Sequence, residues 1–235
     1  MTAKPSGSSG RPSGSSGRPS GRVRIAVLLS GEGTSLENLC ERIDAGEVPA
    51  DVVVVIASKP GAGGLARARR RGIPAVAIPR RSFASVAAFN DALHAELEKH
   101  AVDLVALLGF LSPFELRGRY EERTLNVHPA LIPAFCGEGM YGRRVHEAVL
   151  AAGGKVTGAT VHFADEHYDT GPIVLQQAVD VHEDDTPETL AERVQAAERR
   201  LVPEAIRLFA EGRLEIEGRR VRVRGAVSRP GRAPR

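Results

Sequence analysis

The stretch of sequence that decides the fold is residues 23–35, Val-Arg-Ile-Ala-Val-Leu-Leu-Ser-Gly-Glu-Gly-Thr-Ser. Its first seven residues are apolar except for Arg24, and such a run is typical of a parallel strand that is buried on both faces. After the glycine-rich turn, apolar residues recur at the spacing of one helix face, at Leu36, Leu39, Cys40 and Ile43. The stretch therefore predicts a strand, a tight turn and a helix that lays one face on a sheet.

The alternation of strands and helices continues along the chain. Further strands are expected at residues 51–57, 75–78, 103–107, 155–164 and 172–181. Further helices are expected at residues 65–71, 85–100, 143–152 and from 187 onward. Pro203 should kink or split the last helix, and residues 214–223 suggest a short hairpin. These elements predict one α/β domain with a doubly wound, mostly parallel, Rossmann-like sheet.

Composition separates the two ends of the chain from its body. Residues 6–19 repeat Ser-Gly-Ser-Ser-Gly-Arg-Pro twice, and this composition cannot bury an apolar core. Residues 1–22 and 224–235 are therefore predicted to be disordered tails, with the folded domain over 23–223. The formal net charge of +3 comes from basic residues at the ends, because residues 23–218 hold 21 Lys and Arg against 29 Asp and Glu. An acidic body argues against a folded nucleic-acid-binding surface.

Several classes of protein are excluded by simple features of the sequence. No apolar run reaches the roughly 18 residues of a membrane span, and the N-terminus lacks the apolar segment of a signal peptide. Cys40 and Cys136 are the only cysteines, so we do not expect a disulfide framework. We expect a cytoplasmic location, where thiols stay reduced. We expect small-molecule substrates, no membrane partner and no specific nucleic acid, and a monomer or homodimer.

Residues 124–129, Thr-Leu-Asn-Val-His-Pro, carry the candidate chemistry. Asn126 and His128 are two apart at a strand end, so both side chains point to the same face, and Pro129 turns the chain away. Asp169 stands before Thr-Gly-Pro and could complete an acid/base unit that moves an acyl group onto an amine. The alternatives are a buried, satisfied histidine and an aspartate that caps a turn.

The Gly31-x-Gly33 turn lies between a strand and a helix, where backbone amides and the positive helix end bind phosphate well. It is neither a dinucleotide fingerprint nor a P-loop, and a tight β–α turn is the alternative. Because parallel strands present ligands at their carboxyl ends, this turn, residues 109–110 and residues 126–128 should meet in one cleft. A metal site is not expected, since no His-Glu-x-x-His or cysteine pair at ligand spacing occurs. Cys136 is an alternative nucleophile.

Six segments, in this order, carry a family resemblance. They are Leu-Leu-Ser-Gly-x-Gly (28–33), Gly-Phe-Leu (109–111), Asn-Val-His-Pro-Ala-Leu-Ile-Pro (126–133), Gly-Ala-Thr-Val-His-Phe (158–163), Tyr-Asp-Thr-Gly-Pro-Ile (168–173) and Asp-Asp-Thr-Pro-Glu-Thr-Leu (184–190). Over about residues 23–216 the chain resembles the phosphoribosylglycinamide formyltransferases, which belong to the folate-dependent formyltransferase superfamily. The resemblance implies formyl transfer from 10-formyltetrahydrofolate, a co-substrate, to the amine of phosphoribosylglycinamide in purine biosynthesis.

The resemblance also implies roles for individual residues. His128 would transfer the proton, Asp169 would raise its pKa, and Asn126 would hold the formyl oxygen. The positions that match the ribonucleotide site are Gly31, Glu32, Gly33, Thr34, Ser35, Gln195 and Glu198. The positions that match the folate pocket are Phe110, Leu111, Asn126, Asp165, Glu166, His167, Tyr168 and Asp169.

The sequence departs from the family pattern at several places, and one is after Gly-Phe-Leu, where Ser112-Pro113 follow at once although the family usually has Arg and two apolar residues before Ser-Pro. Glu32 stands where the phosphate loop usually has asparagine, and Val86 stands near the position of an arginine that commonly touches folate, with Arg80 or Arg81 as a candidate substitute. The rivals are a formyltransferase for a sugar amine or for methionyl-tRNA, a formyltetrahydrofolate hydrolase, and a nucleotide-binding module whose arginine tails contact RNA. The enzymatic relatives usually carry an additional domain, for which neither end offers enough residues.

Overall fold

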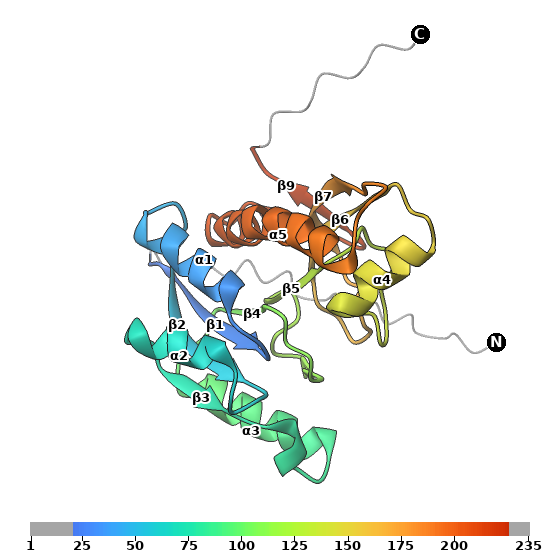
Figure 1. The fold of residues 1–235 in the computed structure, drawn as a ribbon. Helices are drawn as coiled ribbons and strands as arrows, with labels where there is room; N and C mark the ends of the chain where they lie inside the picture. Colours follow the sequence, from blue (N-terminus) through green and yellow to red (C-terminus); the bar gives the residue numbers. More distant parts are fainter. Residues whose placement is uncertain (1–20, 226–235) are drawn as a thin grey trace, which may run out of the picture.

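β1 (Val23–Leu29) lies inside a nine-stranded sheet in the computed structural model, which describes residues 21–225 (Figure 1). Parallel strands flank it on both sides, and all of its residues except Arg24 are buried. Val23, Ile25, Val27 and Leu29 pack into one core, whereas Ala26 and Leu28 pack into another on the opposite face. Burial on both faces explains why the strand is an apolar run without alternation.

The sheet has the order β3-β2-β1-β4-β5-β6-β7-β9-β8. Its other strands are β2 (Ala50–Ala57), β3 (Ala75–Ala77), β4 (Leu104–Leu107), β5 (Thr124–His128), β6 (Val156–Phe163), β7 (Ile173–Asp180), β8 (Leu214–Glu217) and β9 (Arg220–Val223). The helices are α1 (Thr34–Asp44), α2 (Gly63–Arg70), α3 (Val86–Glu98), α4 (Arg143–Ala151) and α5 (Pro187–Ala210), with a 3₁₀ turn at Arg80–Ser82. The neighbouring strands β3, β2, β1, β4 and β5 are all parallel to one another. Strand β6 is antiparallel to both β5 and β7. The predicted doubly wound, mostly parallel sheet is confirmed.

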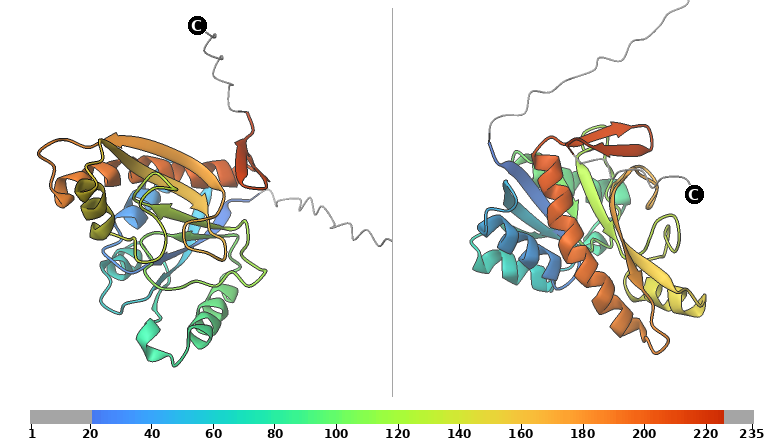
Figure 2. Two further views of the ribbon diagram at one scale, coloured as in Figure 1. Left: turned by 90° about the vertical axis from the view of Figure 1, so that its right-hand side faces the viewer. Right: turned by 90° about the horizontal axis from the view of Figure 1, so that it is seen from above.

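Helices cover both faces of the parallel part. Apolar residues of α1, α2 and α5 enter the core with Ile25 and Val27, and those of α3 enter the core with Leu28 and Ile56. Figure 2 shows α5 crossing the sheet beside α1 and α2, with the β8–β9 hairpin near the far end of α5. Within residues 21–225, no helix is both long enough and apolar enough to cross a membrane.

The predicted split of the last helix is wrong. α5 is one helix of 24 residues that continues through Pro203. Thr186 is its N-cap, and Pro187 lies in its first turn. Pro203 cannot donate a backbone hydrogen bond, but it is buried among apolar residues of α5, and this packing offsets the missing bond. The hairpin over residues 214–223 is confirmed.

The predicted tails lie largely outside the described residues. Of their members, Arg22 pairs with Asp51, and Arg224 pairs with Glu215. Ordered contacts therefore extend slightly beyond both ends of the range 23–223, and the domain boundaries stay a prediction.

Two backbone segments approach closely beside the first turn, and this gives a test of the fold. Gly33 has φ +74°, and a Cβ there would lie 2.5 Å from the Gly64 Cα, whereas Gly46 has φ +75° with open space around it. Gly46→Ala should cost about 1 kcal/mol for the left-handed backbone alone. Gly33→Ala should cost roughly 1 to 3 kcal/mol more because of the clash. Urea unfolding of both variants measures the difference, and equal losses would contradict the close packing of α2 on the turn.

Candidate active site

Strand β5 presents Asn126 and His128 on the face of the sheet that is opposite α5. The residues that alternate with them, Leu125 and Val127, point to the other face and belong to the core under α5. The antiparallel register places Asn126 opposite His162 and His128 opposite Thr160 on β6. Directly opposed residues on antiparallel strands have neighbouring side chains, so this register decides which groups of β6 join the site.

Asp169 enters the site from the turn that connects β6 to β7. It has φ +58°, a left-handed conformation that aspartate tolerates better than most residues. Thr170 Oγ1 donates to both carboxylate oxygens of Asp165 at 2.7 and 2.8 Å and holds the turn closed. At Gly171 a Cβ would lie 1.9 Å from the Phe163 carbonyl oxygen, so only glycine lets the returning chain pass this close.

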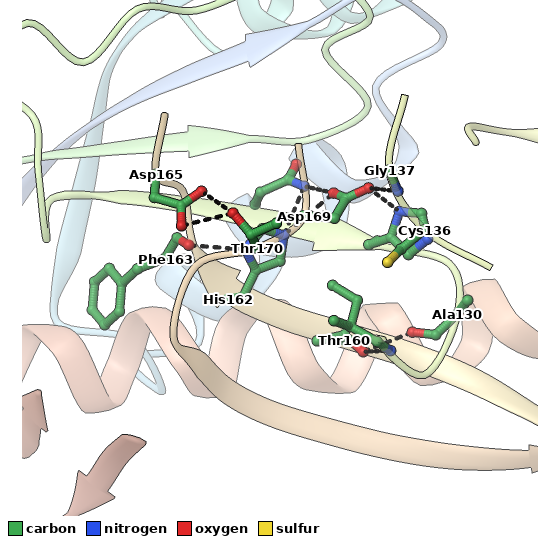
Figure 3. Close-up of polar contacts among 12 residues, drawn as sticks. Ala130, Cys136, Gly137, Thr160, His162, Phe163, Asp165, Asp169 and Thr170 are labelled. Carbon is green, nitrogen blue, oxygen red and sulfur yellow. Dashed lines mark hydrogen bonds and ion pairs between the residues drawn. The ribbon is translucent and has the colours of Figure 1, made fainter. Parts of the chain in front are cut away.

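Three polar side chains lie around the Asp169 carboxylate, and Figure 3 labels Asp169 and one of them, His162. Asp169 Oδ2 lies 3.4 Å from His128 Nδ1, and Asp169 Oδ1 lies 3.5 Å from His162 Nε2. Asn126 Nδ2 donates to Asp169 Oδ1 at 3.3 Å and contacts His162 Nε2 at 3.1 Å. We name Asn126, His128, His162 and Asp169 the polar cluster. Its sequence-predicted members, Asn126, His128 and Asp169, therefore do meet.

The segment after β5 closes over the polar cluster. His128 Nε2 donates to the Phe135 carbonyl oxygen at 2.9 Å, and the Gly137 backbone N–H donates to Asp169 Oδ2 at 2.9 Å. Thr160 anchors the start of this segment, since its hydroxyl donates to the Ala130 carbonyl oxygen at 2.6 Å. The segment thereby shields the His128 ring and the Asp169 carboxylate from water, and side-chain exposure is only 4% for His128 and 9% for Asp169.

Burial and charge act in opposite directions on His128. Burial lowers its pKa below the ordinary histidine value, and the Asp169 carboxylate together with the Phe135 carbonyl opposes only part of this effect. Asp169 acts on this pKa in the expected upward direction, but the net shift of the His128 pKa is downward. The ligand-free protein therefore favours a neutral imidazole on His128 near pH 7.

Asp169 itself remains ionised. Its burial favours the neutral acid, but the contact with the His162 ring, the adjacent His128 ring and the hydrogen bond from the Gly137 N–H together lower its pKa below the usual aspartate value. The polar cluster thus combines an anionic carboxylate with a histidine that can accept a proton.

His162 is the member of the polar cluster that the sequence did not single out as a site residue. Its Nδ1 donates to the Phe163 carbonyl oxygen at 2.8 Å, which leaves Nε2 to accept from the Asn126 amide. The sequence did contain a signal for His162. It lies in the Gly-Ala-Thr-Val-His-Phe segment two residues after Thr160, so the two side chains point to the same face of the strand. Only the register with β5 shows that it contacts Asn126.

The Gly31–Gly33 turn forms the connection to α1, with Gly33 as its N-cap and without a side-chain cap. Its free helix end therefore keeps its first amides available for an anion. Glu32 directs its carboxylate toward Gly63 at the start of α2, where a Cβ would lie 2.4 Å from Glu32 Oε2. The positive end of α2 favours this anion. Thr34 and Ser35 begin α1.

Gln195 and Glu198 lie three apart on α5 and so share one side of the helix. Gln195 is exposed and Glu198 is half-buried, and within residues 21–225 neither forms a hydrogen bond or ion pair with the polar cluster. Burial raises the pKa of Glu198 from its usual 4.5 to about 7. Within the described residues no hydrogen bond or ion pair holds this carboxyl group, and a carboxyl group near its midpoint at neutral pH is a feature of binding sites.

Apart from Asn126, the residues matched to the folate pocket fall into two groups. Phe110 and Leu111 follow β4, and the Leu111 N–H donates to Ser30 Oγ at 2.9 Å, which joins them to the first turn. The other group is the turn Asp165, Glu166, His167, Tyr168 and Asp169, in which Tyr168 is 59% exposed.

The predicted single cleft is only partly formed. A cleft of about 550 Å³ is lined by Gly31, Glu32 and Leu111, but Asn126 and His128 do not line it. In residues 21–225, no group of three or more His, Cys, Asp or Glu side chains is placed to hold a metal ion. The absence of a metal stays a prediction.

Comparison with known proteins gives the family. Residues 23–206 match the family model described as formyl transferase. The chain belongs to the formyl transferase family. Phosphoribosylglycinamide formyltransferase, chloroplastic, of Arabidopsis thaliana is 42% identical over 197 residues, which are 83% of this chain and 68% of that protein. The trifunctional purine biosynthetic protein adenosine-3 of Gallus gallus is 41% identical over 83% of this chain, which spans 19% of its length.

A solved structure extends the match to three dimensions. Glycinamide ribonucleotide transformylase 1 from Symbiobacterium toebii superposes with a TM-score of 0.81 and 45% sequence identity. The match covers 86% of this chain and 94% of that one. The formyl transferase fold therefore accounts for nearly all of the described residues.

The opposing effects on His128 can be separated by titration. We expect the His128 ring to titrate below the ordinary histidine value, and to titrate lower still in Asp169→Asn, because the substitution removes the carboxylate that favours the imidazolium. NMR titration of ring resonances measures both, with His128→Asn to assign the signal. Asp165→Asn is the matched control, since Asp165 contacts Thr170 and not His128. If the titration midpoint of His128 is the same in Asp169→Asn as in wild type, the electrostatic coupling of His128 to Asp169 is contradicted.

The raised pKa of Glu198 predicts a pH-dependent loss of stability. The folded protein holds the Glu198 proton up to about pH 7, whereas the unfolded chain releases it near pH 4.5. Wild type should therefore lose stability relative to Glu198→Gln as the pH rises through this window, by on the order of 2 kcal/mol. Denaturant unfolding between pH 4 and 8 measures the difference, and Glu192→Gln, an exposed change on the same helix, is the control. A difference that does not vary with pH would refute the burial of this carboxyl group.

Proposed function

We propose that this protein transfers the formyl group of 10-formyltetrahydrofolate to the amine of phosphoribosylglycinamide, a step of purine biosynthesis. The observation that carries the proposal is the convergence of Asn126, His128 and Asp169 within hydrogen-bonding reach on one face of β5. The names of the relatives in Arabidopsis thaliana and Symbiobacterium toebii supply the substrate class. Both substrates are small molecules, and a metal has no role in the proposed reaction.

The first step is attack of the substrate amine on the formyl carbon. A new bond forms from the amine nitrogen to this carbon, and the carbonyl electron pair moves to oxygen, which gives a tetrahedral oxyanion. The Asn126 amide donates to this oxygen and stabilises its charge. Because Asn126 Nδ2 already donates to Asp169 and His162, binding of the formyl oxygen exchanges one of these hydrogen bonds and does not require a large movement.

The second step moves one proton from the attacking nitrogen to the departing folate nitrogen. A neutral His128 accepts the proton from the amine, and the lowered pKa keeps it neutral before the reaction. The nearby Asp169 carboxylate then stabilises the imidazolium. His128 returns the proton to the folate nitrogen as its bond to the formyl carbon breaks, which regenerates the neutral ring and releases tetrahydrofolate.

The remaining predicted residues bind the two substrates. The first turn, Gly31 to Ser35, would hold the ribonucleotide phosphate at the start of α1, and Gln195 and Glu198 would contact the ribose side. Phe110, Leu111 and the 165–169 turn would hold the folate. We place the enzyme in the cytoplasm as a monomer or homodimer, where its thiols Cys40 and Cys136 stay unpaired.

Substitution of the proposed catalytic groups tests the mechanism. His128→Ala and Asn126→Ala should each lower kcat by about 10²- to 10⁴-fold, because each removes a group that acts in the transition state. The assay follows the absorbance change on release of tetrahydrofolate, with phosphoribosylglycinamide as acceptor and an amino sugar as the alternative acceptor.

Cys136→Ala provides the control for this test. Cys136 lies beside the polar cluster, and its burial together with the charge of Asp169 raises the pKa of its thiol, which makes it a poor nucleophile. Normal turnover is expected in this variant. Near-normal turnover in His128→Ala, or loss of turnover in Cys136→Ala, would overturn the assignment, and formate release without acceptor would indicate a hydrolase.

A further inference from the structure

Gln176 lies on β7 at the end of a row of polar residues that begins at His128. The β5–β6 register places His128 opposite Thr160, and the β6–β7 register places Thr160 opposite Gln176. Directly opposed residues on antiparallel strands project to the same face, so all three side chains lie on the face that is opposite α5. Thr160 is buried, whereas Gln176 is exposed. The row therefore links the proposed proton acceptor to a surface residue two strands away.

The side-chain amide of Gln176 has one favoured orientation. Its Nε2 donates to the Ile132 carbonyl oxygen and to Thr160 Oγ1, both at 3.0 Å. Both N–H groups of the amide are thus used. A flipped amide would turn its oxygen toward the Ile132 carbonyl, which can only accept, and would lose that hydrogen bond.

This amide also fixes the direction of the Thr160 hydroxyl. A hydroxyl has one proton and two lone pairs. Thr160 Oγ1 accepts from Gln176 and from the Ile132 N–H at 3.2 Å, which leaves its own proton for the next acceptor. That acceptor is the Ala130 carbonyl oxygen at 2.6 Å (Figure 3). Three backbone groups of residues 130–132 are thereby tied to β6 and β7.

The tied segment leads to the hydrogen-bond acceptor of His128. It follows the end of β5 closely, and a turn closed by the Ala134 N–H on the Leu131 carbonyl oxygen at 2.9 Å brings the chain to Phe135. The Phe135 carbonyl oxygen accepts from His128 Nε2 at 2.9 Å. The position of this oxygen relative to the ring therefore depends on where residues 130–132 are held.

The Phe135 carbonyl decides which nitrogen of His128 is free to take up a proton. A neutral imidazole has a single N–H, and a carbonyl partner places it on Nε2. Nδ1 is then the nitrogen with the lone pair, 3.4 Å from Asp169 Oδ2. Without the carbonyl, the carboxylate would draw the single proton to Nδ1, because an N–H beside an anion is a strong hydrogen bond. The basic nitrogen would then be Nε2, on the side of the ring away from the carboxylate.

We propose that Gln176 is a positioning residue for formyl transfer, and this rests on the proposed function. By holding Thr160 and residues 130–132, it keeps the Phe135 carbonyl on His128 Nε2. Nδ1 of the ring thereby stays free to receive the amine proton beside the carboxylate, and it gives the same proton to the departing folate nitrogen. Gln176 acts through these residues and transfers no proton itself.

The experiment replaces Gln176 with leucine, which has a similar volume and no donor, in the full chain. We expect kcat to fall about tenfold with little change in KM for either substrate, because the ring is held in the wrong state and no substrate contact is removed. ¹⁵N NMR of the neutral His128 ring should show the N–H on Nε2 in wild type and a shift toward Nδ1 in Gln176→Leu. The His162 ring is the internal reference, since its Nδ1–H donates to the Phe163 carbonyl in both proteins.

Two further variants supply the control and a second test. Gln177→Leu makes the same change at the adjacent residue, which accepts from Arg200 Nε of α5 at 3.2 Å, and it should leave kcat and the His128 tautomer unchanged. Gln176→Glu keeps the size and polarity of the side chain but has no N–H in its ionised form, so it should reproduce the leucine effect. Urea unfolding identifies the folded variants, and the glutamate variant decides the matter if the leucine variant does not fold.

The remaining outcomes each have a distinct meaning. Wild-type kcat in a folded Gln176 variant would overturn the inference, as would a lower kcat with the His128 N–H still on Nε2. A higher KM for the folate at unchanged kcat would make Gln176 a substrate-binding residue and also overturn it. Absence of formyl transfer in wild type would refute the proposed function, and the NMR comparison would still show whether Gln176 sets the tautomer.

Discussion

The Asp169 carboxylate is the constraint on which the rest of the site depends. It accepts from the Gly137 N–H and the Asn126 amide, and it faces the rings of His128 and His162. These partners come from β5, β6 and the segment after β5, so a single buried charge fixes three parts of the chain relative to one another. A buried carboxylate without such partners would be expensive, and the polar cluster is therefore coupled to the folding of the segment that closes over it.

The antiparallel pairing of β5 with β6 gives the site its chemistry, and the parallel part of the sheet gives it its anion sites. β5 is parallel to β4 on one side and antiparallel to β6 on the other. Through β6 it acquires His162 as the neighbour of Asn126, and through β4 it lies near Leu111 and the first turn. The acid/base groups and the first turn thus lie at the carboxyl ends of parallel strands, although the cleft beside the first turn is not lined by Asn126 or His128.

Burial decides the protonation states that the mechanism uses. Desolvation lowers the pKa of His128 in spite of the adjacent carboxylate, and it raises the pKa of Glu198 to about 7. Both pKa shifts arise from packing, and the direction of neither can be predicted from the residue type alone. A neutral histidine beside an ionised aspartate is able to accept a proton and then to keep the resulting charge, which is the sequence of events that transfer between two nitrogens requires.

The sequence by itself determined the strand and helix order, the two-faced burial of β1 and the candidates Asn126, His128 and Asp169, because hydrophobic periodicity and short motifs are local properties. It did not determine that α5 stays intact at Pro203, where packing outweighs a missing hydrogen bond. His162, the direction of Glu32 and the net pKa of His128 were decided only by tertiary structure. Strand register, the start of a second helix and desolvation involve residues that are far apart in sequence, and no local pattern records them.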